Sequence, residues 1–207
     1  MTIEDIIAND LVEDIRTGTA LDDSKELIGF IGDVLPNIEF SICNRSMLGF
    51  EFEQPSTNPN CAILEIGVWK DGYKSATNIF WKSKQASSFY FGLDAEDKTS
   101  LSNPSANIYI LQKDITSLQD VVAFAMSKDV NQFDFIMFDQ EYSVNEMLEA
   151  WRITEHLAPG GTIAVHDVHY HPGPKKLVEA LDPDKFDVKI TCTHKIMDYG
   201  LAFIKRK

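Results

Sequence analysis

Residues 61–72 read CAILEIGVWKDG, an apolar run that stops at a glycine turn before a predicted helix. A short continuous apolar run is typical of a strand that helices cover on both faces. Gly67 ends the run, and a residue without a Cβ allows a ligand to come close to the backbone. The helix that follows offers free N–H groups at its N-terminus, where polar ligands bind in α/β proteins. This stretch therefore predicts the first strand of a sheet with a ligand site at its end.

Six further strands are predicted along the chain, and most gaps between them are long enough for a helix. They cover residues 89–94, 107–112, 133–139, 161–167, 186–193 and 199–206. Alternating strands and helices predict βαβ units with parallel strands. Only HKIMD separates the last two runs, so one of these two strands should run antiparallel. The predicted fold class is α/β: a doubly wound, mostly parallel, seven-stranded Rossmann-like sheet with one antiparallel strand.

The clearest predicted helix covers residues 143–157. Ser143 and Glu146 form a capping box at its start, and Pro159-Gly160-Gly161 follow as a turn into the next strand. Residues 1–56 differ, because two candidate helices (4–15 and 22–35) precede an irregular stretch that ends in the turn-rich EQPSTNPN. We therefore expect a helical N-terminal cap over residues 1–56 and a ligand-binding domain over residues 57–207.

Composition narrows the classes of partner. A chain of 207 residues fits one domain, and its formal net charge of -13 would repel a phosphate backbone. No apolar run reaches the roughly 20 residues of a membrane-spanning helix, and the acidic N-terminus is unlike a signal peptide. The three cysteines are scattered and predict neither a disulfide framework nor a zinc site. We expect a cytoplasmic protein that acts on a small-molecule substrate and has no nucleic-acid or membrane partner. Whether it forms a homo-oligomer is left open.

Polar residues stand where successive apolar runs stop, which is where ligands bind in open α/β sheets. Asp94 ends the second run, and its carboxylate could accept both hydroxyls of a ribose. Asp114 and Ile115 follow the third run and could flank an adenine. Each aspartate alone could instead cap a helix, since Asp is favoured there.

Four segments together resemble the class I S-adenosylmethionine (SAM)-dependent methyltransferases: LEIGVWKDG, GLDAED, FDFIMFDQEYS and LAPGGTIAVHDVHYHPGPKKLVEAL. The likeness covers about residues 60–205 and is strongest to bacterial small-molecule enzymes grouped with macrocin O-methyltransferase and the cephalosporin-hydroxylase-like proteins. It implies that residues 57–207 bind SAM. It also implies that the cofactor-binding residues are Glu65, Gly67, Trp69, Gly72, Asp94, Asp114 and Ile115. The fourth-strand motif departs from the family, because DQEY stands at 139–142 where the family usually has DGDH.

Three of the five histidines fall between residues 166 and 171, at the end of a predicted strand. Asp139 ends the neighbouring strand, so the sheet should bring it close to His166 and Asp167. These three residues could hold Mg²⁺ or Mn²⁺. A histidine, His166 or His169, could instead take the proton from a methyl acceptor. The candidate catalytic residues are therefore Asp139, His166, Asp167 and His169, and the alternative is that this loop is only structural.

The predicted activity is O-methylation of a small polar molecule, such as a sugar or natural product, and two other functions remain open. The spacing from Gly72 to Asp94 is close to that of an NAD-dependent oxidoreductase, but Trp69 stands where its second glycine should be. The altered DQEY motif also leaves room for a SAM-binding protein without catalytic activity.

Overall fold

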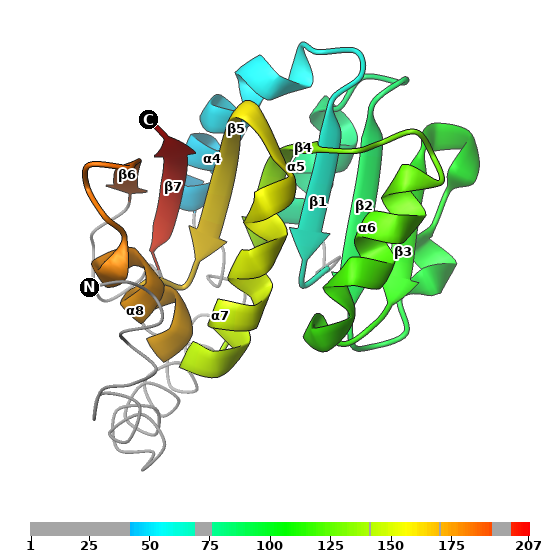
Figure 1. The fold of residues 1–207 in the computed structure, drawn as a ribbon. Coiled ribbons are helices and arrows are strands. Elements are labelled where there is room, and N and C mark those ends of the chain that lie inside the picture. The colour runs from blue at the N-terminus through cyan, green and yellow to red at the C-terminus, as the bar shows by residue number, and fades with distance from the viewer. Residues whose placement is uncertain (1–41, 69–75, 141, 170, 192–199) are drawn as a thin grey trace.

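The computed structural model describes residues 42–68, 76–140, 142–169, 171–191 and 200–207. The strands among them form one seven-stranded sheet in the order β3-β2-β1-β4-β5-β7-β6. β7 is antiparallel to its neighbours β5 and β6, and its arrow points the opposite way to those of β1 and β5 (Figure 1). This confirms the predicted doubly wound sheet with one antiparallel strand. The strands are β1 (Ala62–Ile66), β2 (Phe89–Asp94), β3 (Ile108–Gln112), β4 (Phe133–Phe138), β5 (Leu157–His166), β6 (Phe186–Thr191) and β7 (Leu201–Arg206).

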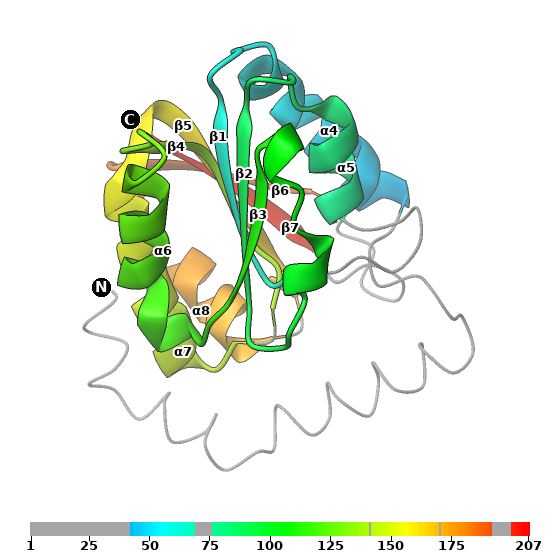
Figure 2. The same cartoon turned by 90° about the vertical axis from the view of Figure 1, so that its right-hand side faces the viewer.

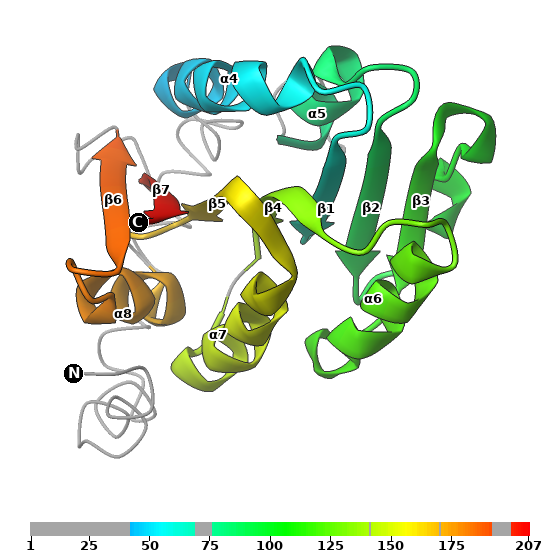
Figure 3. The ribbon, with the colours of Figure 1, turned by 45° about the horizontal axis from the view of Figure 1, so that its top comes forward.

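Helices cover both faces of the sheet, as Figures 2 and 3 show. One face carries α4 (Ile42–Ser56) and α5 (Ala76–Ser83), and the other carries α6 (Leu118–Met126), α7 (Val144–Trp151) and α8 (Pro172–Ala180). Short 3₁₀ turns join the larger elements: η2 (Thr99–Leu101), η3 (Pro104–Ala106), η4 (Ile115–Ser117) and η5 (Arg152–His156). Within the described ranges, no helix has both the length and the apolar character that crossing a membrane would require.

Alternating side chains of each strand enter two separate cores. Ile63 and Phe135 face α4 and α5, whereas Leu64 and Ile136 face α6 and α7. All four side chains have no exposed surface. The apolar runs seen in the sequence are therefore strands buried on both sides, because the helical layers leave neither face of the central sheet in water.

Residues 42–56 form a helix, so the prediction of an irregular stretch there is wrong. Phe52 on α4 is fully buried, and its ring lies edge-on to Phe80 at 5.0 Å and to Phe135 at 5.4 Å. This packing against the sheet stabilises a helix that local sequence disfavours, since it contains Pro55 in its last turn. The helices expected over 4–15 and 22–35 lie outside the described residues, and the division into cap and SAM-binding domain stays a prediction.

The predicted helix over 143–157 is shorter than expected. α7 ends at Trp151, a 3₁₀ turn continues to His156, and Leu157 already pairs with Phe133 in the sheet. The predicted Pro159-Gly160-Gly161 turn lies inside β5, where the pairing jumps from Phe133–Leu157 to Phe135–Thr162. A bulge therefore replaces the loop, because the strand begins pairing before its glycines.

The capping box predicted at the start of α7 is confirmed. Ser143 Oγ accepts from the Glu146 backbone N–H at 3.3 Å, and Glu146 Oε2 accepts from the Ser143 N–H at 2.8 Å. We expect Ser143→Ala to lower the free energy of unfolding by about 1 kcal/mol, because it leaves a helix N–H unsatisfied. Urea unfolding measures this, with Ser127→Ala as control, since that exposed hydroxyl donates to the Phe124 carbonyl at the end of α6 and satisfies no helix N–H at an N-terminus. Equal effects of the two substitutions would contradict the capping role.

Candidate active site

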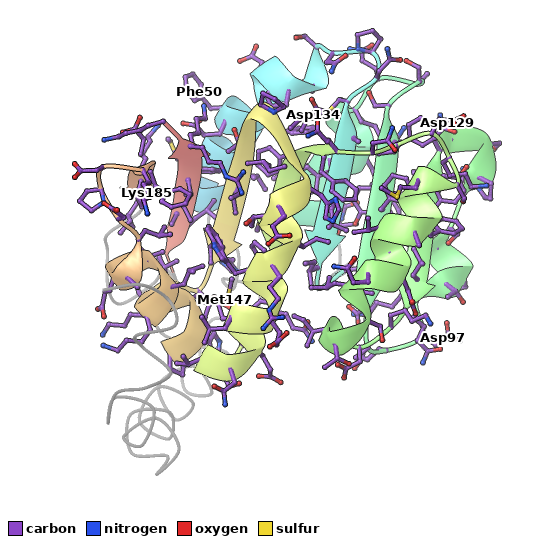
Figure 4. All side chains as sticks on the ribbon, viewed as in Figure 1. Phe50, Asp97, Asp129, Asp134, Met147 and Lys185 are labelled. Carbon is purple, nitrogen blue, oxygen red and sulfur yellow. The ribbon has the colours of Figure 1, made fainter. Side chains whose placement is uncertain are left out.

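The parallel strands all end at one edge of the sheet, and the predicted site residues follow these ends. Figure 4 labels Asp97, beyond the end of β2, on the opposite edge from Asp134 at the start of β4. The order β3-β2-β1-β4-β5 places Asp114, Asp94, Gly67, Asp139 and His166 in sequence along this edge. Strand order reverses between β1 and β4, and such a switch point is where open α/β sheets bind ligands.

Gly67 lies at the centre of this edge and has a left-handed backbone with φ of 90°. A Cβ added here would overlap the carbonyl oxygen of Asp139 and lie 2.6 Å from its carbonyl carbon. The Gly67 N–H also donates to the Leu93 carbonyl at 2.9 Å. The chain leaving β4 therefore approaches Gly67 closely and brings Asp139 against the end of β1. The approach of a ligand to this glycine stays a prediction.

Glu65, on β1, is completely buried among hydroxyl groups. Its Oε1 accepts from Thr77 Oγ1 at 2.9 Å, and its Oε2 accepts from the Tyr90 hydroxyl. Burial raises the pKa of the Glu65 carboxyl well above its usual value, the Tyr90 hydrogen bond opposes this shift, and the Asp139 charge adds to it. Glu65 therefore ties β1 to β2 and α5, and its predicted contact with SAM stays a prediction.

Asp94 ends β2 with a largely buried carboxylate that already has three N–H donors. Oδ2 accepts from the Val68 N–H at 2.9 Å and from Lys98 Nζ at 2.8 Å, and Oδ1 accepts from the Glu96 N–H at 2.9 Å. Lys98 also donates to the Val68 carbonyl at 2.6 Å and so joins the turns after β1 and β2. Lys98 was not among the site residues predicted from the sequence. Its spacing of four residues from Asp94 indicates an ion pair only on a helix, and residues 95–98 are not helical, so no sequence signal could have found it.

The remaining predicted cofactor residues are only partly described. Asp114 is exposed and caps η4, because its Oδ1 accepts from the Thr116 N–H at 3.0 Å. Ile115 is half-buried against the core under α6. Trp69 and Gly72 lie outside the described residues, so their predicted role remains a prediction. The structure thus gives Asp114 the capping role that the sequence left open, and leaves its contact with adenine untested.

Asp139, His166 and Asp167 do come together as predicted. His166 Nδ1 lies 2.8 Å from Asp139 Oδ1 and 3.3 Å from Asp167 Oδ1, and the His166 side chain is 3% exposed. Asp167 has a left-handed backbone with φ of 62°, which Asp tolerates better than most residues. His171, to which the sequence assigned no role, joins the group, because its Nε2 lies 3.5 Å from Asp167 Oδ2.

His169 lies in the same loop but faces another neighbour. Its ring packs against Gly200, where an added Cβ would overlap the imidazole. Its Nε2 is buried and has no hydrogen-bond partner within the described part of the chain. Gly200, at φ of 78°, is therefore the residue that leaves room for this ring. The predicted catalytic role of His169 stays a prediction.

Asp139, His166 and Asp167 do not fit a three-ligand metal centre as they are arranged. The Nδ1 atom of His166 lies within 3.3 Å of an oxygen of each carboxylate, so the three side chains contact one another directly instead of surrounding a shared position. Among the residues that the structure describes, no three His, Cys, Asp or Glu side chains form a group that could hold a metal ion. The metal role of these residues therefore stays a prediction.

No known family model matches this sequence, and no curated protein matches it either. Solved structures do match. MycE methyltransferase from the mycinamycin biosynthetic pathway, solved with Mg, S-adenosylhomocysteine (SAH) and mycinamycin VI, has a TM-score of 0.56 and 17% identity over 78% of this chain. The present chain spans about half of MycE, 48% of its length.

Two smaller structures match over nearly their whole length. A Streptococcus mutans protein assigned as a methyltransferase, solved with SAH, has a TM-score of 0.54 and 15% identity over 80% of this chain and 99% of its own. A Clostridium thermocellum protein assigned as an rRNA methylase has a TM-score of 0.56 and 15% identity over 78% of this chain and 94% of its own. Together with the strand order, these matches show that the chain has the Rossmann-like fold of the class I SAM-dependent methyltransferases.

Proposed function

We propose that this chain transfers the methyl group of SAM to a hydroxyl of a small polar molecule. The observation that carries the proposal is the contact of 2.8 Å between His166 Nδ1 and Asp139 Oδ1. The pair lies at the ends of β5 and β4, beside the switch point at Gly67. A buried imidazole held by a carboxylate is an arrangement that general-base catalysis uses, and its place coincides with the expected ligand site.

The reaction requires that the cofactor be held and that the acceptor hydroxyl lose its proton, and the chain's own residues supply both functions. When bound, SAM supplies an electrophilic methyl group that transfers by in-line displacement. Asp94 fits a ribose, because its carboxylate lies at the end of β2 and its Oδ2 accepts from the Val68 N–H in the turn after β1. We assign to His166 the neutral tautomer in which Nδ1–H donates to Asp139, because the two atoms lie 2.8 Å apart. In this tautomer Nε2 carries the lone pair that takes the proton of an acceptor hydroxyl.

Charge favours a small acceptor over RNA. Matching folds include MycE, solved with mycinamycin VI, as well as a protein assigned as an rRNA methylase, so the fold allows both classes. The formal net charge of this chain is -13, which opposes the approach of a phosphate backbone and favours the cationic sulfonium of SAM. We therefore propose a small hydroxylated molecule as the methyl acceptor and keep RNA as the second candidate.

Metal assistance is the second candidate mechanism. The Mg in the MycE structures supports it, whereas Asp139, His166 and Asp167 would have to rearrange to bind a cation together. Steady-state turnover with and without EDTA separates the two mechanisms. If EDTA abolishes turnover and added Mg²⁺ restores it, metal assistance replaces His166 as the means of activating the hydroxyl.

Isothermal titration calorimetry with SAM tests the cofactor assignment directly. We expect Asp94→Ala to weaken SAM binding by roughly 10- to 100-fold, because charge-assisted hydrogen bonds to the ribose are lost. Asp97→Ala is the matched control, since this exposed aspartate caps the same loop through Thr99. Binding of NAD with no heat from SAM would instead support the oxidoreductase that the sequence left open.

Turnover is tested by following SAH release with a panel of monosaccharides, phenols and hydroxylated macrolides. Release of SAH with one class of acceptor identifies the substrate class. If SAM binds and no acceptor in the panel or RNA is methylated, the non-catalytic SAM-binding alternative is favoured.

A further inference from the structure

We propose that Lys98 competes with the cofactor ribose for the Asp94 carboxylate and thereby sets the affinity of this site for SAM. The proposal rests on the proposed function, because it takes the ribose diol as the group that Asp94 accepts. Lys98 follows β2 by four residues, and its ammonium lies 2.8 Å from Asp94 Oδ2. The carboxylate and the ammonium are both mostly shielded from water, with side-chain exposures of 10% and 20%.

The number of hydrogen bonds that Asp94 can accept creates the competition. Its two oxygens together offer about four lone-pair directions. Three donors already use them: the backbone N–H groups of Val68 and Glu96, and Lys98 Nζ. A ribose diol brings two donors, which makes five in total. The two backbone donors are fixed by the turns after β1 and β2, so Lys98 is the donor that can leave.

Lys98 has another carboxylate within reach when it leaves. Glu96 Oε2 lies 3.5 Å from Lys98 Nζ, and the Glu96 side chain is 79% exposed. Lys98 Nζ also donates to the Val68 carbonyl at 2.6 Å, a bond that a small rotation of the side chain can retain. The ammonium therefore exchanges one carboxylate for another without losing all its partners, which keeps the cost of opening the site small.

The test compares nucleoside binding by Lys98→Met with that by the unchanged chain. We expect Lys98→Met to bind both SAM and neutral adenosine about five- to tenfold more tightly, because the ribose no longer displaces an ammonium. Binding of 2′,3′-dideoxyadenosine, which lacks both hydroxyls, should not change. Calorimetry at one salt concentration measures all three ligands. Adenosine carries no charge, so its gain cannot come from the altered net charge of the protein.

Lys176→Met is the matched control for the loss of a lysine. Lys176, on α8, forms an ion pair of 2.9 Å with Glu179, and its side-chain exposure of 24% is close to that of Lys98. This control should leave all three affinities unchanged. Glu96→Gln provides a second variant at an exposed position. It should weaken adenosine binding about twofold, because it removes the carboxylate to which Lys98 moves.

The outcomes separate the inference from the proposed function. If neither SAM nor adenosine binds the unchanged chain or Lys98→Met, the proposed function fails. If they bind and Lys98→Met binds them equally or more weakly, Lys98 does not compete with the ribose and the inference is overturned. Tighter binding of dideoxyadenosine by Lys98→Met would also overturn it, because the gain would then not depend on the ribose hydroxyls.

Discussion

Replacing His166 with alanine is expected to lower the rate of methyl transfer by about 100- to 10,000-fold, the range that a positioned general base contributes. The reason is the 2.8 Å contact between His166 Nδ1 and Asp139, which fixes the ring with its other nitrogen as the base. The rate is measured as SAH release with an acceptor that the panel identifies. The SAM dissociation constant should change little, because Asp94, at the end of β2, lies three strands away from His166 on β5.

Three further substitutions check that this loss comes from the base. Asp139→Asn should lower the same rate, because an amide no longer holds the Nδ1–H tautomer. His156→Ala, at the end of η5, should leave it unchanged. The assignment is wrong if His166→Ala retains full turnover. If Asp139→Asn and Asp167→Asn both keep full activity, neither carboxylate at this edge takes part in the reaction.

The second large effect concerns stability. We expect Gly67→Ala to lower the free energy of unfolding by at least about 3 kcal/mol, because a Cβ at φ of 90° would overlap the Asp139 carbonyl. The strands β1 and β4 would have to separate at their ends to relieve this overlap. Urea unfolding monitored by circular dichroism measures the change.

Gly160→Ala is the control that separates backbone strain from overlap. Gly160 also has a left-handed backbone, with φ of 76°, but an added Cβ there meets no atom within 4 Å. Gly160→Ala should lower the free energy of unfolding by only about 1–2 kcal/mol, which is the penalty of the left-handed conformation itself. Equal losses at the two positions would show that the approach of Asp139 to Gly67 does not restrict the residue there.

The two predictions depend on different levels of structure. The His166 prediction was available from the sequence in outline, because His166 and Asp139 end consecutive apolar runs. The Gly67 prediction could not be made from the sequence, because it depends on a contact with Asp139, 72 residues further along the chain. A glycine before a helix can make room either for a ligand or for a neighbouring segment of backbone, and only the tertiary structure distinguishes these two explanations.

The sequence by itself determined the strands, their mostly parallel arrangement and the capping box at Ser143. These features follow from apolar runs, turn residues and side-chain-to-backbone bonds within a few residues, all of which are local. It also placed Asp94, Asp139, His166 and Asp167 at strand ends, because a parallel sheet brings those ends to one edge.

The sequence predicted that Asp139 lies near His166 and Asp167, but only the tertiary structure decided the other contacts and the atoms that make them. It paired β4 with β1, turned Asp167 towards His166 and His171, and placed Lys98 on the Asp94 carboxylate. It also made residues 42–56 a helix, through the packing of Phe52 against Phe80 and Phe135. Such contacts join residues far apart in the chain, and their energies come from burial and charge pairing that no local pattern encodes.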